Sequence, residues 1–305
     1  MNFKNLIKLA GFSDKKELTE LWIETFGDDE KFISSFLDAY LIPEYNVPVI
    51  IRDKKIVSAL YLIEFPLYSK SEIIGNCQYL FAAATKKEYQ NNGYMSELIK
   101  YSADLCRNRG VHAIFLFPQN QSGKLFDYYS KFGFKSIYGA EKIISKKNTD
   151  LSEYKLEKKI ITDVNVFDRL YDAYFEFASK QELSPVKDRL FYFKCAASYL
   201  DNPGSYFAVL ENNSENNVEK FCYVFYKKYN NNYYINDIIL LGNNNIQKII
   251  EILSCFNLEI IVPATSKFTE NRHMPLAMLL PLSNSASNIT NNLEYPVYIN
   301  MFMNI

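Results

Sequence analysis

The sequence predicts an α/β protein of the α+β type, with two tandem units that each contain a mixed, mostly antiparallel sheet flanked by helices. The chain has 305 residues, about twice the length of a typical domain, and 48% of them are hydrophobic, enough for packed cores. One order of helical and strand patterns occurs twice. Between the two occurrences, residues 145–159 are polar with little apolar periodicity, which indicates a linker. We therefore expect domains at residues 1–150 and 151–305.

The first unit shows helical periodicity, then strand patterns, then both in alternation. Breaks at "RDKK" and "SKSE" divide its strand-rich part into a meander of three strands. The expected elements, in order, are two helices at 15–26 and 29–41, the three strands within 47–68 and 71–85, a helix at 94–110, a buried strand at 111–118, and a short helix followed by a strand within 122–137.

The second unit repeats this order of elements but not the sequence. Its expected elements are helices at 166–180 and 188–200, strands at 205–211, 221–228 and 233–242, a helix at 246–256 and a strand at 258–264. Its strand-to-helix turn, "LLGNNNIQKII", has the glycine before the asparagines and no Gln or Arg three residues ahead of it. We therefore expect phosphate chemistry only in the first unit and regard the second as degenerate.

Charge and cysteine content narrow the class of protein. Lysine and arginine total 34 against 35 acidic residues, a net charge of −1, which favours neither a nucleic-acid partner nor an anionic membrane. Five scattered cysteines without metal-like spacing indicate a reducing compartment and predict no metal site. No signal-like or membrane-spanning apolar run is present, so we expect a cytoplasmic protein that does not use the membrane.

The stretch "YQNNGYMSELIKY", residues 89–101, is the strongest local signal in the chain. A strand that turns tightly into a helix directs unpaired backbone N–H groups, supported by the helix dipole, at one point where an anion can bind. Glycine at position 93 allows close approach of the backbone to that anion. The alternative is an ordinary turn, because the lysine of a P-loop and the further glycines of a Rossmann motif are both missing.

Two motifs in order decide between these readings. "QNNGYM", followed one helix and one strand later by "YSKFGF", resembles the GCN5-related N-acetyltransferases, whose Gln/Arg-x-x-Gly-x-Gly/Ala turn binds the pyrophosphate of acetyl-coenzyme A. Gln90 and Gly93 match that pattern, whereas Met95 replaces its last small residue. The two-unit order also resembles the Eis-like relatives with tandem acetyltransferase units.

The resemblance implies an acetyl-coenzyme A site across three segments. The end of the fourth strand would offer backbone groups to the acetyl and pantetheine portions, and the turn would hold the pyrophosphate. Asn120 or Ser122 would hydrogen bond to the cofactor. The implied cofactor-binding residues are Ala83, Ala84, Thr85, Gln90, Asn91, Asn92, Gly93, Tyr94, Met95, Ser96 and Asn120.

Tyr129 is the implied general acid, which would protonate the coenzyme A thiolate as it leaves. Counting back from Gly133 and Phe134 selects Tyr129 rather than Tyr128, although tyrosines in an aromatic helix such as "LFDYY" commonly only pack. No general base is assigned. Glu64 is the acid nearest in the strand pattern, and neither of the histidines, at positions 112 and 273, has a catalytic context.

A neutral amine that attacks directly, or loses its proton through water, needs no named base. The Eis-like resemblance offers the C-terminal carboxylate of Ile305 as another candidate.

The predicted function is therefore transfer of an acetyl group from acetyl-coenzyme A to a primary amine, with the second unit shaping the acceptor cleft. The acceptor is a small-molecule or peptide amine that the sequence does not identify. The alternatives are a non-catalytic acyl-coenzyme A-binding or ligand-sensing module and a purely structural protein. Aromatic residues on the first two helices either line the acceptor pocket or form core: Trp22, Phe26, Phe36 and Tyr40.

Overall fold

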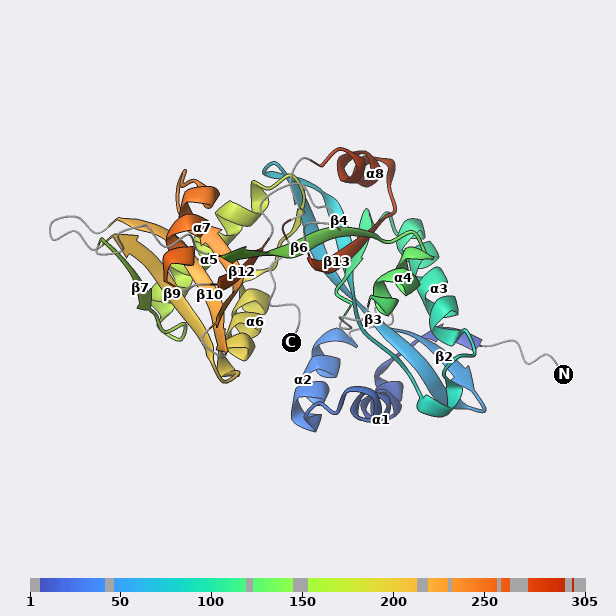
Figure 1. Ribbon diagram of the computed structural model, residues 1–305. Coiled ribbons are helices and arrows are strands. Elements are labelled where there is room, and N and C mark those ends of the chain that lie inside the picture. Colours follow the sequence, from blue (N-terminus) through green and yellow to red (C-terminus); the bar gives the residue numbers. More distant parts are fainter. Residues whose placement is uncertain are drawn as a thin grey trace.

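The structure, a computed structural model, describes residues 6–41, 47–118, 123–144, 153–212, 219–229, 232–256, 259–263, 274–293 and 298. These residues form one 13-stranded sheet with helices packed on both of its faces (Figure 1). None of the helices in these ranges has the length and apolar character that crossing a membrane requires.

The first repeat follows the predicted order, with an additional strand at its start. Its strands are β1 (Leu6–Leu9), β2 (Pro48–Arg52), β3 (Lys55–Ser69), β4 (Glu72–Thr85), β5 (Ala113–Leu116) and β6 (Lys135–Ile144). Its helices are α1 (Lys15–Phe26), α2 (Glu30–Tyr40), α3 (Tyr94–Asn108) and α4 (Lys124–Ser130), with short 3-10 turns at Phe12–Asp14 and Lys87–Tyr89.

The second repeat has the same order. Its strands are β7 (Tyr154–Lys158), β9 (Ser205–Asn212), β10 (Lys220–Tyr229), β11 (Asn232–Leu240), β12 (Glu259–Pro263) and β13 (Met274–Pro281). Its helices are α5 (Val164–Ser179), α6 (Arg189–Asp201) and α7 (Ile246–Cys255), and α8 (Asn284–Asn291) follows β13. The short β8 (Ser184–Pro185) pairs with β3 of the first repeat.

The two repeats exchange their last strands. The sheet order is β1-β2-β3-β4-β5-β13-β6-β12-β11-β10-β9-β7, so equivalent strands of the two repeats lie at equal distances from the two edges. β13 lies between β5 and β6 and is antiparallel to both, while β6 also pairs with β12. Figure 1 shows β6 and β13 crossing side by side between the two halves. Each half of the sheet therefore depends on a strand from the other repeat.

Successive side chains of β3 point to opposite faces of the sheet, and they divide the core of the first half into two layers. Ala59 and Tyr61 pack into the cluster beneath α1 and α2, whereas Leu60 and Leu62 pack into the cluster beneath α3 and α4. All four side chains are buried. A strand with both faces covered by helices reads as a continuous apolar run, which is why β3 carries so few polar residues.

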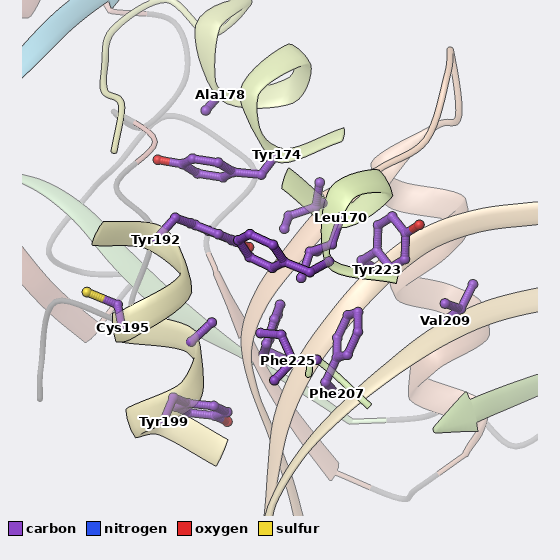
Figure 2. Packing of buried hydrophobic residues seen from close by; sticks show 14 of the residues in the cluster. Leu170, Tyr174, Ala178, Tyr192, Cys195, Tyr199, Phe207, Val209, Tyr223 and Phe225 are labelled. Carbon is purple, nitrogen blue, oxygen red and sulfur yellow. The ribbon is translucent and has the colours of Figure 1, made fainter. Parts of the chain in front are cut away.

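The second half also has a core layer on each face of the sheet, and one of these layers is rich in aromatic rings (Figure 2). Helices α5 and α6 cover one face, where the Tyr174 and Tyr192 rings stack at 4.1 Å and the Phe207 and Phe225 rings at 4.7 Å. Helix α7 covers the opposite face through side chains that include Ile249. Offset stacking of this kind adds stability beyond the burial of apolar area.

The predicted tandem architecture is confirmed, with three differences. The two sheets are joined into one because the exchanged strands bridge them. The predicted linker at 145–159 contains β7, where Tyr154 and Leu156 pack inward and Lys155 pairs with the buried Glu211 at 3.0 Å, so the charged residues belong to a strand edge. Strands β1, β8 and β13 and helix α8 were not predicted. The boundary at residue 150 stays a prediction, and the strand exchange crosses it.

We expect a fragment of residues 1–150 not to fold alone, because β5 and β6 would both lose β13 and the buried side chains of Met278 and Leu279. Each buried side chain of this size contributes about 1.5–3 kcal/mol, and an exposed strand edge also favours aggregation. Amide NMR dispersion of the fragment tests this. Coexpression with residues 151–305 is the control and should restore a folded complex. A monomeric, well-dispersed 1–150 fragment would contradict the strand-exchange argument.

Candidate active site

The sheet opens where β4 separates from β5. The two strands pair in parallel at only three positions, the last of them Tyr79 with Phe115. Beyond this point the register of β4 against β3 shifts, and Ala82 adopts a left-handed φ of 44°. An extra residue in one strand bends that strand and increases its twist. In the described part of the chain no strand then pairs with the β5-facing side of β4, which leaves backbone groups available there.

A pocket of about 170 Å³ lies at this opening. Both faces of the sheet contribute to it: Trp22 and Phe26 come from α1, and Leu125 and Tyr129 come from α4 on the other face. The strands and the two loops beside them supply the remaining residues, which are Asp28, Tyr79, Leu80, Phe81, Ala82, Ala83, Leu116, Phe117 and Pro118. We infer that the pocket passes through the sheet between the separated strands.

Helix α3 begins without a side-chain cap, and its first turn packs into the cluster that contains Tyr129. Its N-cap is Gly93, which has a left-handed φ of 81°. A Cβ added at Gly93 would meet no atom within 4 Å, so the turn faces open space. The first N–H groups of a helix have no partner within it and lie at the positive end of the helix dipole. This end of α3 is therefore suited to bind an anion.

The equivalent helix of the second repeat is capped by its own sequence. The side chain of Asn245 precedes α7 and accepts hydrogen bonds from the backbone N–H groups of Gln247 at 2.9 Å and Lys248 at 3.2 Å. These are the donors that an anion would need. The reversed order of glycine and asparagine in the two turns thus has a physical consequence: α3 offers its N-terminal donors and α7 does not.

Side chains of the turn before α3 support its backbone from within. Gln90 Nε2 donates to the Thr85 carbonyl at 3.2 Å, and Asn92 Nδ2 donates to the carbonyls of Tyr89 and Gln90. Asn91 has a left-handed φ of 62°, which asparagine tolerates better than most residues. Gln90 and Asn92 therefore hold the turn in shape through their side chains, and Asn91 supports it through its left-handed backbone.

The next three predicted residues lie on the first turn of α3. Met95 packs against the cluster shared by α3 and α4, as does Tyr94. Ser96 Oγ lies 3.1 Å from the hydroxyl of Tyr128, which links α3 to α4. The departure from the small residue expected at position 95 is therefore accommodated by packing against the helix layer.

The predicted end of β4 divides into two environments. Ala83 lines the pocket. Ala84 is buried, and its carbonyl accepts a hydrogen bond from Ser58 Oγ at 3.0 Å, while the Thr85 hydroxyl lies 2.8 Å from the same Oγ. Ser58, which no sequence motif indicated, thus anchors the strand just after the bend.

Tyr129 combines burial with access to the pocket. The residue is 8% exposed and its ring packs edge-on against Phe134 and Tyr128. No described residue hydrogen bonds to its hydroxyl, whereas Tyr128 is engaged with Ser96. Burial, together with neighbouring Tyr128, raises the pKa of Tyr129 to about 12. The phenol is therefore a neutral donor at any physiological pH.

The base candidates lie away from this pocket or outside the described residues. Glu64 accepts hydrogen bonds from Asn76 at 3.1 Å and Gln78 at 2.9 Å on the surface of the sheet and does not line the pocket. The ring of His112 packs over Gly75 at the start of β5, and it does not line the pocket either. Four residues lie outside the described ranges: Asn120, Ser122, His273 and Ile305.

The structure adds Asp28 to the site. Its carboxylate lines the pocket and accepts a hydrogen bond from Trp22 Nε1 at 2.7 Å. The neighbouring Asp29 is the N-cap of α2 and binds the N–H groups of Lys31 and Phe32. The sequence did contain a signal for Asp28. Two aspartates precede α2, and capping of this helix needs only one of them.

Comparisons with known proteins agree with this fold. The family model described as "Acetyltransferase (GNAT) domain" matches residues 7–137. A search of curated proteins gives no significant sequence match. Several solved structures share the fold over most of the chain.

A probable N-acyltransferase from Enterococcus faecalis V583, described as a conserved protein of unknown function, has a TM-score of 0.67 at 13% identity and covers 93% of this chain and 74% of its own. A GCN5-related N-acetyltransferase from Anabaena variabilis ATCC 29413 has a TM-score of 0.64 at 12% identity, with coverage of 93% and 74%. Eis1 from Mycobacterium abscessus has a TM-score of 0.61 at 8% identity, with coverage of 92% and 75%. At these identities the likeness is one of fold. Residues 7–137 thus match the model of the GCN5-related N-acetyltransferase (GNAT) domain, and over most of its length the chain shares its fold with Eis1 and a GCN5-related N-acetyltransferase.

Proposed function

We propose that the protein is an acetyl-coenzyme A-dependent N-acetyltransferase that acts on a primary amine. One observation carries this proposal: Tyr129 borders the pocket at the gap between β4 and β5, and the uncapped first turn of α3 packs into the same cluster as Tyr129. Neither the second repeat nor an ordinary strand-to-helix turn combines these features. The unpaired cysteines among the described residues also support a reducing, cytoplasmic location.

The residues present suit the pyrophosphate and the pantetheine arm of acetyl-coenzyme A. The N–H groups at the start of α3 would hold the pyrophosphate, with Gly93 leaving room for close approach. The free side of β4 around Ala83 would pair with the amides of the pantetheine arm as an added strand does. A backbone N–H at that edge would also polarise the thioester carbonyl.

Acetyl-coenzyme A, when bound, supplies an acetyl group on a thioester that a neutral amine can attack. The amine nitrogen bonds to the acetyl carbon as the carbon–sulfur bond breaks. Tyr129 donates a hydrogen bond to the departing sulfur, and the proton that the nitrogen loses reaches the sulfur through water. Full transfer from a phenol of pKa about 12 to a thiol of ordinary pKa about 8.5 is uphill, so Tyr129 acts mainly by a hydrogen bond that strengthens as charge builds on sulfur.

Gly93→Ala should weaken acetyl-coenzyme A binding about tenfold or more, because the added methyl points into the space where the phosphate would lie and the left-handed backbone is strained. Calorimetry measures the affinity. Gly110→Ala is the matched control: Gly110 follows the other end of α3, has φ of 72° and also has no atom within 4 Å of an added Cβ. Both variants should lose about 1 kcal/mol of stability. Equal affinities of the two variants for acetyl-coenzyme A would contradict the assignment of the pyrophosphate site to this turn.

Tyr129→Phe should lower kcat about a hundredfold or more, with little change in KM for acetyl-coenzyme A, because general acid–base groups typically contribute that much to rate. Tyr128→Phe is the control, since it removes only the contact with Ser96. Thiol release with a panel of amines gives both constants. If acetyl-coenzyme A binds but no amine releases thiol in the unmodified protein, the non-catalytic coenzyme A-binding module is the better description.

The pH dependence gives a separate test of Tyr129. Burial raises the pKa of Tyr129 from its ordinary value of 10.0 to about 12. The phenol therefore keeps its proton below pH 10.0 and loses it only as the pH rises through about 12. We expect no fall in kcat between about pH 8 and about pH 10 from this group, whereas an exposed phenol would be half ionised at about pH 10. An alkaline fall in kcat near pH 9 that is absent in Tyr129→Phe would contradict the buried, neutral donor.

A further inference from the structure

A second pocket, of about 270 Å³, lies between the two repeats. Helix α2 of the first repeat and α6 of the second form its walls, and Ile63, Tyr79 and Phe81 from β3 and β4 form its floor. The walls contribute Phe32, Ser35, Phe36, Ala39, Tyr40, Phe191, Lys194, Cys195 and Ser198. Because the walls belong to different repeats, this pocket exists only in the assembled tandem fold.

Aromatic rings from helices α2 and α6 and from strand β4 dominate this pocket. Phe36 contacts Tyr40 at 4.5 Å and Phe81 at 5.4 Å between ring centroids, and Tyr40 meets Phe191 edge-on at 6.2 Å. Phe36, Tyr40, Phe81 and Phe191 are only partly buried, so their exposed portions face the open space. An aromatic or other flat apolar group would bury these surfaces.

Lys194 is the only charged residue among the described residues that line the pocket. It is exposed on α6 and pairs with no acidic side chain in the described part of the chain. A cation at the rim of an apolar pocket attracts an anionic group and opposes a second cation. Aromatic rings alone would also accept an ammonium group, but repulsion from the positive charge of Lys194 disfavours one in this pocket.

The pocket adjoins the candidate active site. Tyr79 and Phe81 line both pockets, and these two β4 residues immediately precede the bend at Ala82. A ligand that lies between α2 and α6 can therefore extend past Phe81 toward the gap between β4 and β5. Its reactive end would approach the sheet from the face that α1 and α2 cover, opposite Tyr129 on α4.

We propose that this pocket, named here the α2–α6 cleft, binds the acceptor, and that the acceptor is a weakly basic aromatic amine carrying a carboxylate or similar anionic group. The inference rests on the proposed acetyltransferase function. The ring packs among Phe36, Tyr40 and Phe191, and the anion pairs with Lys194. An aromatic amine is already neutral at neutral pH, so its nitrogen attacks without a base, in keeping with the lack of a base among the pocket's described residues other than Asp28.

The test measures acceptor binding separately from turnover. Acetyl-coenzyme A affinity is measured first by calorimetry. Saturation-transfer NMR, with coenzyme A present, then compares para-aminobenzoate, para-aminophenylacetate and para-aminophenylpropionate with aniline, which lacks the anion, and beta-alanine, which lacks the ring. We expect at least one of the three arylamine carboxylates to bind about fivefold or more tightly than both comparators.

Two variants locate the contacts. Lys194→Met should weaken the arylamine carboxylate about threefold to fivefold and leave aniline unchanged, while Lys31→Met, on α2 outside the cleft lining, should change neither. Ala39→Phe should fill the cleft and weaken every ring compound, with acetyl-coenzyme A affinity unchanged.

The outcomes separate the two proposals. Absence of acetyl-coenzyme A binding would overturn the proposed function itself. Normal acetyl-coenzyme A binding combined with no preference for the arylamine carboxylates, or with no effect of Lys194→Met on them, would overturn only the assignment of the α2–α6 cleft.

Discussion

The position of β13 between β5 and β6 is the constraint on which the rest of the molecule depends. β5 has only four residues, and β4 leaves it after Tyr79. β5 stays in the sheet because its other edge pairs with β13 along its whole length, from Ala113 to Leu116. A strand held on one side can be released on the other without losing its place. The gap that forms the candidate site in the first repeat is thus stabilised by a strand from the second.

The same exchange explains why two similar repeats have different roles. It fixes the two halves in one sheet and places α6 opposite α2, so the second repeat supplies a wall of the α2–α6 cleft. Its own helix α7 is capped by Asn245 and needs no external anion to satisfy those N–H groups. A repeat that has a self-capped helix can contribute shape without contributing a second anion site. The contrast with Gly93 depends on a single position at the start of each helix.

The sequence predicted the elements whose signals are local. Periodicity located the major helices and the meander of β2 to β4, and the two motifs singled out Gly93, which begins α3, and Tyr129, which lines the pocket. It did not predict β13, because a strand exchanged with a distant repeat has no local signal beyond an apolar run between prolines 275 and 281. Lys194 was missed for a related reason, since its surroundings come from other elements, whereas Asp28 had a local signal in the pair of aspartates before α2. β7 was hidden by charged side chains on its exposed face.

The electrostatic character of the two adjoining pockets points to one kind of chemistry. Burial opposes the phenolate form of Tyr129, and Lys194 beside aromatic walls opposes a protonated amine. Lys194 is the one charge among the described residues that line the α2–α6 cleft, so an acceptor in this cleft is expected to be a neutral amine, while the Asp28 carboxylate lies in the adjoining pocket. A reaction that begins from a neutral amine and ends with a neutral thiol avoids both charged states, because nitrogen loses a proton as sulfur gains one. On this argument, the basicity of the acceptor is set by the pocket that binds it, and Tyr129 has only to keep its own proton available.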